Sequence, residues 1–132
     1  MRIYFDTNVL ISAYVSRGIC ADLMRHALTE HELLTGEVNV AELRRILRDR
    51  FKATAERVDA VEAELRAETV IPRPSKPSSI AIRDPDDAWV LASAVDGAAD
   101  LLVTGDDDLL AIAAHAPLPI VSPRGCWERL RG

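Results

Sequence analysis

The sequence predicts an α/β fold, a three-layer α/β/α arrangement around a central, mostly parallel sheet of about four to five strands. Short apolar runs alternate along the chain with longer segments in which apolar residues recur at helical spacing. This alternation is typical of a parallel sheet that helices cover on both faces. The length of 132 residues, 48% of them hydrophobic, suits one domain with a sizeable core, so we expect residues 1–132 to form a single domain.

In the first half of the chain, strands are predicted from short apolar runs and helices from longer periodic segments. Val40, Leu43 and Leu47, for example, recur at the spacing of one helix face. The predicted elements, in order, are a strand at 2–6, a helix that starts at 8–11 and breaks near 16–18, a helix at 21–31, a strand at 32–35 before Gly36, and helices at 38–51 and 55–67.

In the second half, prolines and glycines mark the element boundaries. Asp84 and Pro85 suit a helix start, with Asp as the N-cap and Pro in the first position, and Gly97 suits its end. The predicted elements, in order, are a strand at 69–71, an extended or loop-like stretch at 72–79, a helix from 84 to 95, a strand at 101–104, a short helix at 109–114, an edge strand at 119–121 and a closing helix at 123–130.

The apolar segments and the cysteines indicate where the protein resides. No run reaches the roughly 18 consecutive apolar residues of a membrane span, and the N-terminus enters a strand without a signal-peptide pattern. We therefore expect a cytoplasmic protein with no membrane contact. Cys20 and Cys126 are too few for a disulfide framework, which favours two reduced thiols.

Four acidic residues lie at expected element boundaries. Asp6 and Asp106 each follow an apolar strand-like run, which would place them at the carboxyl ends of strands, where open α/β sheets carry their sites. On helical wheels, Glu42 falls at the edge of an apolar stripe and Asp87 falls on the face that packs against the protein body. For Asp6 and Asp106 taken singly, an ordinary helix N-cap is an equally good interpretation.

Carboxylates gathered at one edge repel one another and are stable together mainly when a hard divalent cation neutralises them. The pattern therefore predicts metal-dependent chemistry with Mg²⁺ or Mn²⁺. The net charge of −5 would by itself argue against a nucleic-acid partner. Bound divalent ions would cancel most of that charge, so the acidic composition does not exclude such a partner.

Basic side chains crowd one stretch of the chain, at 44–57. Their members are Arg44, Arg45, Arg48, Arg50, Lys52 and Arg57. Arginines in such a cluster could contact phosphates or pair with an acidic partner, and the alternative is a solvated helix face. Trp89 and Trp127 could stack on bases, although packing is the more usual role of tryptophan in such helices.

The four acidic segments, in this order, resemble the PIN domain family, specifically the small bacterial VapC-like ribonucleases that are toxins of toxin–antitoxin systems. The resemblance covers nearly the whole chain and implies a PIN-like fold. Each motif alone would be weakly specific, but the ordered set is specific. The matching motifs are Asp-Thr-Asn at 6–8, Ala-Glu-Leu at 41–43, Asp-Pro-Asp-Asp at 84–87 and Thr-Gly-Asp at 104–106.

The resemblance implies metal-dependent hydrolysis of RNA phosphodiester bonds and a role for each site residue. Asp6 and Asp87 would be the principal metal ligands, and Glu42 and Asp106 would complete a second position, with Asp108 as a helper. Thr7, Asn8 and Thr104 would orient these carboxylates. Asp86 and Asp108 leave the register of the third and fourth acids ambiguous. The candidate contacts to RNA or to an antitoxin are Arg44, Arg45 and Arg48.

The resemblance also implies partners, namely an antitoxin that covers the acidic groove with a basic side chain and a second copy in a homodimer. Two alternatives remain. A PIN fold could be kept for binding only, without turnover. A phosphoacceptor receiver domain also gathers acids at strand ends, but it resembles a pattern with an acidic pair after the first strand and a lysine after the last. Here Thr7 and Asn8 follow Asp6, and Arg124 follows the last strand.

Overall fold

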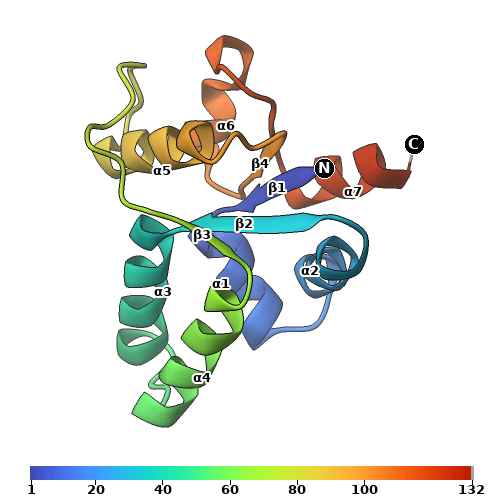
Figure 1. Ribbon diagram of the computed structural model, residues 1–132, viewed down its shortest axis with the longest axis vertical. Coiled ribbons are helices and arrows are strands. Elements are labelled where there is room, and N and C mark those ends of the chain that lie inside the picture. The colour runs from blue at the N-terminus through green and yellow to red at the C-terminus, as the bar shows by residue number, and fades with distance from the viewer. Residues whose placement is uncertain (132) are drawn as a thin grey trace.

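A five-stranded sheet in the order β3-β2-β1-β4-β5 crosses the middle of the computed structural model, which describes residues 1–131 (Figure 1). All four strand pairs are parallel. The strands are β1 (Arg2–Phe5), β2 (Glu32–Gly36), β3 (Thr69–Ile71), β4 (Leu101–Val103) and β5 (Ile120–Val121). The predicted parallel sheet of four to five strands inside an α/β/α fold is confirmed.

The helices follow the predicted order along the chain, with boundaries shifted by a few residues. They are α1 (Thr7–Val15), α2 (Ile19–Glu30), α3 (Glu37–Asp49), α4 (Ala55–Arg66), α5 (Pro85–Asp96), α6 (Asp107–Ala111), the 3-10 turn η1 (Ala113–His115) and α7 (Pro123–Arg131). The short helix expected at 109–114 begins two residues earlier and ends sooner. It begins earlier because the Asp106 side chain caps it by accepting a hydrogen bond from the Asp108 backbone N–H.

Alternation along the strands divides the core into two layers. Ile3 and Phe5 face the layer of α1, α2, α3 and α4, whereas Tyr4 between them faces the layer of α5 and α6. Figure 1 shows these helices on opposite sides of the sheet. Because both faces are covered, the central strands are buried and the sheet positions the loops at its ends rigidly.

The register of β1 and β4 sets the position of the acidic residues. Phe5 pairs with Val103 in parallel, so Asp6 and Thr104 leave adjacent strands at the same edge of the sheet. The Asp6 backbone N–H donates to the Val103 carbonyl at 3.0 Å, which continues the ladder by one step. Helix α1 begins at the residue after Asp6 and α6 begins three residues after Thr104, so this edge collects acids and helix N-termini together.

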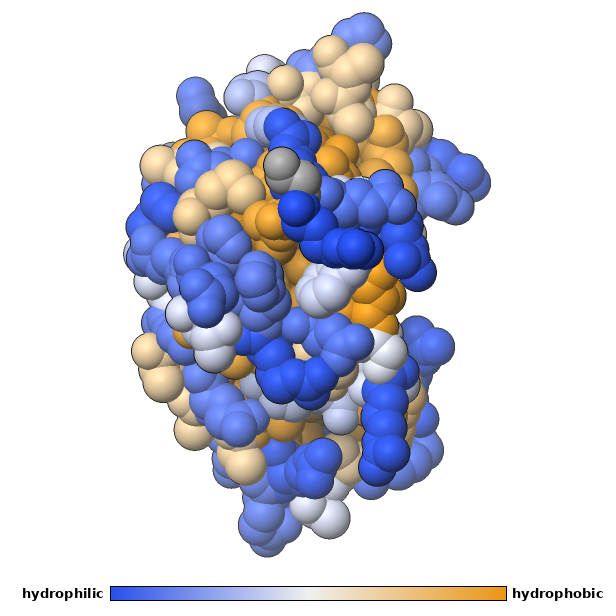
Figure 2. All heavy atoms as spheres, turned by 90° about the vertical axis from the view of Figure 1, so that its right-hand side faces the viewer, coloured by the Kyte–Doolittle hydropathy of each residue, from blue (hydrophilic) through white to orange (hydrophobic). Residues whose placement is uncertain are grey.

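The surface is mixed in polarity, as the mean hydropathy of +0.03 suggests. On the face turned toward the viewer in Figure 2, hydrophilic side chains alternate with hydrophobic ones, and the hydrophobic atoms gather mainly in the upper half. Within residues 1–131, no helix combines the length and apolar character needed to cross a membrane. Cys20 and Cys126 are buried free thiols in the same core layer.

Candidate active site

Asp6 is a buried carboxylate held by four hydrogen bonds. It follows β1, caps α1, and is 4% exposed. Its Oδ1 accepts from the Thr7 backbone N–H at 2.8 Å and from Asn39 Nδ2 at 3.0 Å. Its Oδ2 accepts from Thr104 Oγ1 at 2.7 Å and from Asn8 Nδ2 at 3.3 Å. Neighbours on α1, on α3 and just after β4 therefore fix the orientation of this side chain.

The environment of Asp6 disfavours its charge despite these donors. Burial raises the pKa of Asp6 to about 6, although the hydrogen bonds from Thr104 and Thr7 act in the opposite direction. The nearby negative charges of Glu42 and Asp106 raise it further. A carboxylate in this position gains from a neighbouring cation.

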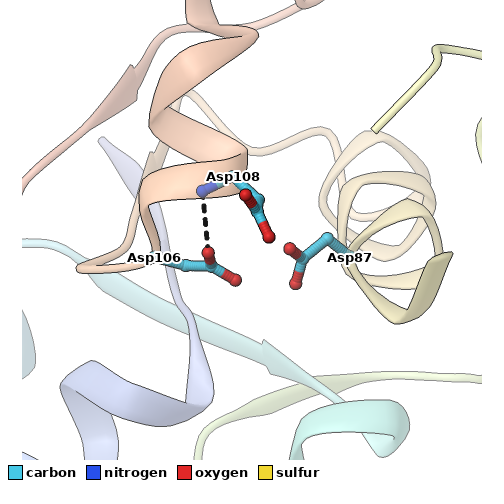
Figure 3. A group of neighbouring side chains, drawn as sticks. All are labelled: Asp87, Asp106 and Asp108. Carbon is cyan, nitrogen blue, oxygen red and sulfur yellow. Dashed lines mark hydrogen bonds between the residues drawn. The ribbon is translucent and has the colours of Figure 1, made fainter. Parts of the chain in front are cut away.

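Three further carboxylates converge beside Asp6. Asp87 lies in the first turn of α5, Asp106 is the N-cap of α6, and Asp108 lies in the first turn of α6. One carboxylate oxygen from each lies within 4.8 Å of the others, and Figure 3 shows the side chains pointing toward one another. The backbone N–H of Asp108 donates to Asp106 Oδ1 at 2.9 Å, which ties the two α6 acids together. We call these three residues the acidic triad.

Within residues 1–131, no basic side chain forms an ion pair with the acidic triad, and Asp87 is its most buried member. It is buried at 6% exposure, and its Oδ2 has no hydrogen-bond partner in the part of the chain that the structure describes. Burial raises the pKa of Asp87 to about 8, and the carboxylates of Asp106, Asp6 and Asp84 add to the shift. A buried polar atom without a partner needs an explanation such as an ion. Every atom of the triad that could bind a metal is a carboxylate oxygen, so these residues fit a hard divalent cation such as Mg²⁺ or Mn²⁺.

The structure groups the predicted site residues differently from the prediction at two positions, Asp6 and Glu42. Asp87 and Asp106 join Asp108 in the acidic triad, whereas Asp6, expected as a principal ligand, is not a member. The oxygens of Asp6 are occupied by hydrogen bonds, whereas Asp87 Oδ2 is free. Glu42 also lies outside the triad, half-buried on α3 at the edge of two neighbouring pockets.

The three predicted supporting residues all contact Asp6 or its neighbours. Thr7 and Thr104 donate directly to the Asp6 carboxylate, as described above. Asn8 donates to Asp6 and accepts from the Gly105 backbone N–H at 2.8 Å. Thr104 Oγ1 also accepts from the Asp106 backbone N–H at 2.9 Å. These contacts link the ends of β1 and β4 into one rigid polar unit.

Asn39 is a site residue that the sequence analysis missed. It is fully buried on α3, and its Nδ2 donates both to Asp6 Oδ1 and to Thr7 Oγ1, at 3.0 and 2.9 Å. One signal was available. Asn39 stands four residues before Leu43, on the apolar face of the helix, and a polar amide in that position indicates a buried hydrogen-bond partner.

The arginines of α3 do not act alike. Arg44 donates to Asp59 and Glu62 of α4, and Arg48 donates to the adjacent Asp49. These two predicted contacts to RNA or an antitoxin are therefore already neutralised by carboxylates of the chain itself. Arg45 is exposed and forms no ion pair within residues 1–131.

Comparisons with known proteins agree with this architecture. A family model described as "PIN domain" matches residues 2–108. Among solved structures, VapBC2 from Rickettsia felis bound to a promoter DNA fragment aligns with a TM-score of 0.64 and 14% identity, over 92% of this chain and 98% of that one. VapBC-1 from nontypeable Haemophilus influenzae gives 0.63 and 19%, over 94% and 99%. Mycobacterium tuberculosis VapC20, described as a sarcin-ricin loop cleaving toxin, gives 0.59 and 14%, over 83% and 93%. No curated protein matches the sequence.

Proposed function

The chain belongs to the PIN domain family, and on this premise we propose that it is an endoribonuclease that depends on Mg²⁺ or Mn²⁺ and is the toxin of a type II toxin–antitoxin pair. The observation that carries the proposal is the free Oδ2 of Asp87, buried within a cluster of carboxylates. Family membership also disfavours the phosphoacceptor receiver alternative.

Each acidic residue of the site has a separate proposed role. Asp87, Asp106 and Asp108 would hold a divalent ion, since their oxygens converge. When bound, divalent ions in such sites activate a water and stabilise the charge of the leaving oxygen. Asp6, fixed by Thr104 and Asn39, adds negative charge at a defined position beside the ion. Glu42 lies at the rim, where it would position a water or take up its proton.

The similar solved structures and the acidic surface together support an RNA substrate and an antitoxin as partners. Two similar structures are described as VapBC complexes and a third as a toxin that cleaves the sarcin-ricin loop, which supports an RNA substrate and a cognate antitoxin. We expect the antitoxin to cover the acidic groove with a basic side chain, because such a cation would relieve the same repulsion as a metal. We also expect a cytoplasmic homodimer.

Cleavage of a mixed, end-labelled RNA pool tests the proposal. We expect products with Mg²⁺ or Mn²⁺ and none with EDTA, and we expect Asp6→Asn and Asp87→Asn to lose cleavage. Asp96→Asn is the matched control, because Asp96 is an exposed aspartate at the other end of the same helix, away from the acidic triad. Cleavage that persists in Asp87→Asn would contradict the assigned site. Binding of RNA without any metal-dependent cleavage would favour a PIN fold used for binding only.

A further inference from the structure

A pocket of about 360 Å³ opens directly beside the acidic residues. It lies between α3, the start of α5 and the segment that follows β3. Thr7 and Glu42 line it, and both also belong to the surroundings of Asp6. A ligand that fills this pocket would therefore lie next to the acidic site.

Two arginines from separate elements face this pocket. Arg45 comes from α3, and Arg73 comes from the segment after β3. Both are exposed, and neither forms an ion pair anywhere in the described chain. Glu42 and Asp86 line the same pocket without pairing with them. These two guanidinium groups are thus available to an outside anion, unlike those of Arg44 and Arg48.

Trp89 holds one of these arginines in place. The Arg73 guanidinium carbon lies 4.4 Å from the centre of the Trp89 ring, within the range of a cation–π contact. Trp89 is half-buried on α5, and the exposed part of its ring offers Arg73 a platform. A guanidinium stacked on a ring keeps its N–H groups free for phosphate oxygens, and less entropy is lost when it binds them.

We propose that this pocket is a subsite for single-stranded RNA, in which Arg45 and Arg73 bind the phosphate next to the cleaved linkage and Trp89 is the positioning residue for Arg73. The proposal rests on the proposed nuclease function and names a part of its substrate site. RNA is favoured over an acidic peptide because the pocket shares Thr7 and Glu42 with the surroundings of Asp6, so a polynucleotide bound here would bring its next phosphodiester toward the acidic residues.

Equilibrium binding of RNA to a variant that cannot cleave it tests this subsite independently of catalysis. The probe is a fluorescein-labelled, mixed-sequence single-stranded RNA of about twelve nucleotides, followed by anisotropy in an Asp87→Asn background with Mg²⁺. We expect Arg45→Gln and Arg73→Gln each to weaken binding by about 5- to 10-fold and to reduce the salt slope by about 0.7. The matched control is Arg48→Gln, because Arg48 lies on the same helix but is paired with Asp49.

Trp89 variants test the positioning role. Trp89→Leu should weaken binding as much as Arg73→Gln does, and Trp89→Phe should recover most of it, because a phenyl ring keeps the platform. The double variant Trp89→Leu/Arg73→Gln should bind no more weakly than Arg73→Gln alone. Additive losses in that double variant would contradict the positioning role.

Several results would overturn the subsite. One is unchanged RNA affinity in both arginine variants, and another is binding of polyglutamate, but not RNA, with the same dependence on Arg45 and Arg73. The outcomes also separate the two proposals. Arginine-dependent RNA binding by a protein that never cleaves RNA would refute the nuclease and keep the subsite. Cleavage with unchanged kcat/KM and binding in both variants would refute the subsite and keep the nuclease.

Discussion

The side-chain amide of Asn39 donates a hydrogen bond of 3.0 Å to the carboxylate of Asp6, joining α3 to the end of β1 beneath the acidic site. The amide oxygen of Asn39 can only accept, so the hydroxyl of Tyr4, 2.5 Å away, must be its donor. Burial raises the pKa of Tyr4, which keeps that proton in place. Ser93 Oγ lies 2.7 Å from the same hydroxyl, so a buried polar chain extends from α5 to Asp6.

Replacing Asn39 should separate folding from catalysis. Asn39→Ala removes the hydrogen bonds that Asn39 donates to Asp6 and Thr7, and it removes the acceptor that Asn39 offers to the Tyr4 hydroxyl. We therefore expect a loss of about 2–3 kcal/mol in the free energy of unfolding. Cleavage should fall at least about tenfold, because Asp6 loses its fixed orientation. Urea denaturation and RNA cleavage measure the two effects. Tyr4→Phe is the control, since it keeps the Asn39–Asp6 bond and should retain most activity; a larger loss in Tyr4→Phe than in Asn39→Ala would contradict this account.

Gly36 is required by the same polar chain. It ends β2, and a Cβ built there would overlap the hydroxyls of Ser93 and Tyr4. We expect Gly36→Ala to destabilise the protein by about 1–3 kcal/mol through overpacking. Adding Tyr4→Phe and Ser93→Ala should restore part of that loss, because both substitutions remove the overlapping oxygens. Thermal unfolding of the wild type, Gly36→Ala, the Tyr4→Phe/Ser93→Ala double variant and the triple variant checks this, and no recovery in the triple variant would mean that the overlap is not the cause.

Most of the fold could be predicted from the sequence because strands and helices here have distinct periods and clear ends. The run Ile3–Phe5 and the Asp84-Pro85 start illustrate this, since each identifies an element with no tertiary information. The start of α6 was predicted two residues too late. Asp106 is both the N-cap of this helix and a member of the acidic triad. A local pattern cannot separate these two roles.

The acids of the candidate site stand out in the sequence, whereas their grouping depends on packing. Asp6, Asp87 and Asp106 could be found from their positions at element boundaries, yet only three-dimensional packing shows that Asp108 rather than Asp6 shares the triad. The roles of Arg44 and Arg45 also depend on packing. The two are adjacent in sequence, but only Arg44 faces the carboxylates of α4.

Metal binding should depend on Asp108 and not on Asp107. Asp108→Asn removes an oxygen of the triad, so we expect the rise in melting temperature caused by Mg²⁺ or Mn²⁺ to shrink strongly. At a hundred times Kd, a single ion adds about 2.7 kcal/mol of stability to the wild type, which a thermal scan resolves. Asp107→Asn is the matched control, because Asp107 is exposed and outside the triad. Equal metal responses in the two variants would remove Asp108 from the ligand set.

Without metal, the protein should lose stability as the pH rises. The pKa values of Asp6 and Asp87 are raised to about 6 and about 8, so the folded state binds more protons than the unfolded chain, whose aspartates titrate near their ordinary value of about 3.9. Their contribution is therefore fully present below about pH 4 and is lost as the pH rises through about 6 and then about 8. Urea unfolding in EDTA across this range measures the slope.

The matched comparison is Asp87→Asn, which cannot ionise at this position. It should be less sensitive to pH than the wild type between about pH 6 and about pH 8, and it should exceed the wild type in stability at the upper end, where the buried Asp87 carboxylate must otherwise carry its charge. Saturating Mg²⁺ should flatten the wild-type slope in the same range, because a bound cation favours the ionised carboxylates. A wild-type slope in EDTA that matches Asp87→Asn would mean that Asp87 is already ionised at neutral pH. The repulsion within the acidic triad would then be relieved by something other than a proton or a metal ion.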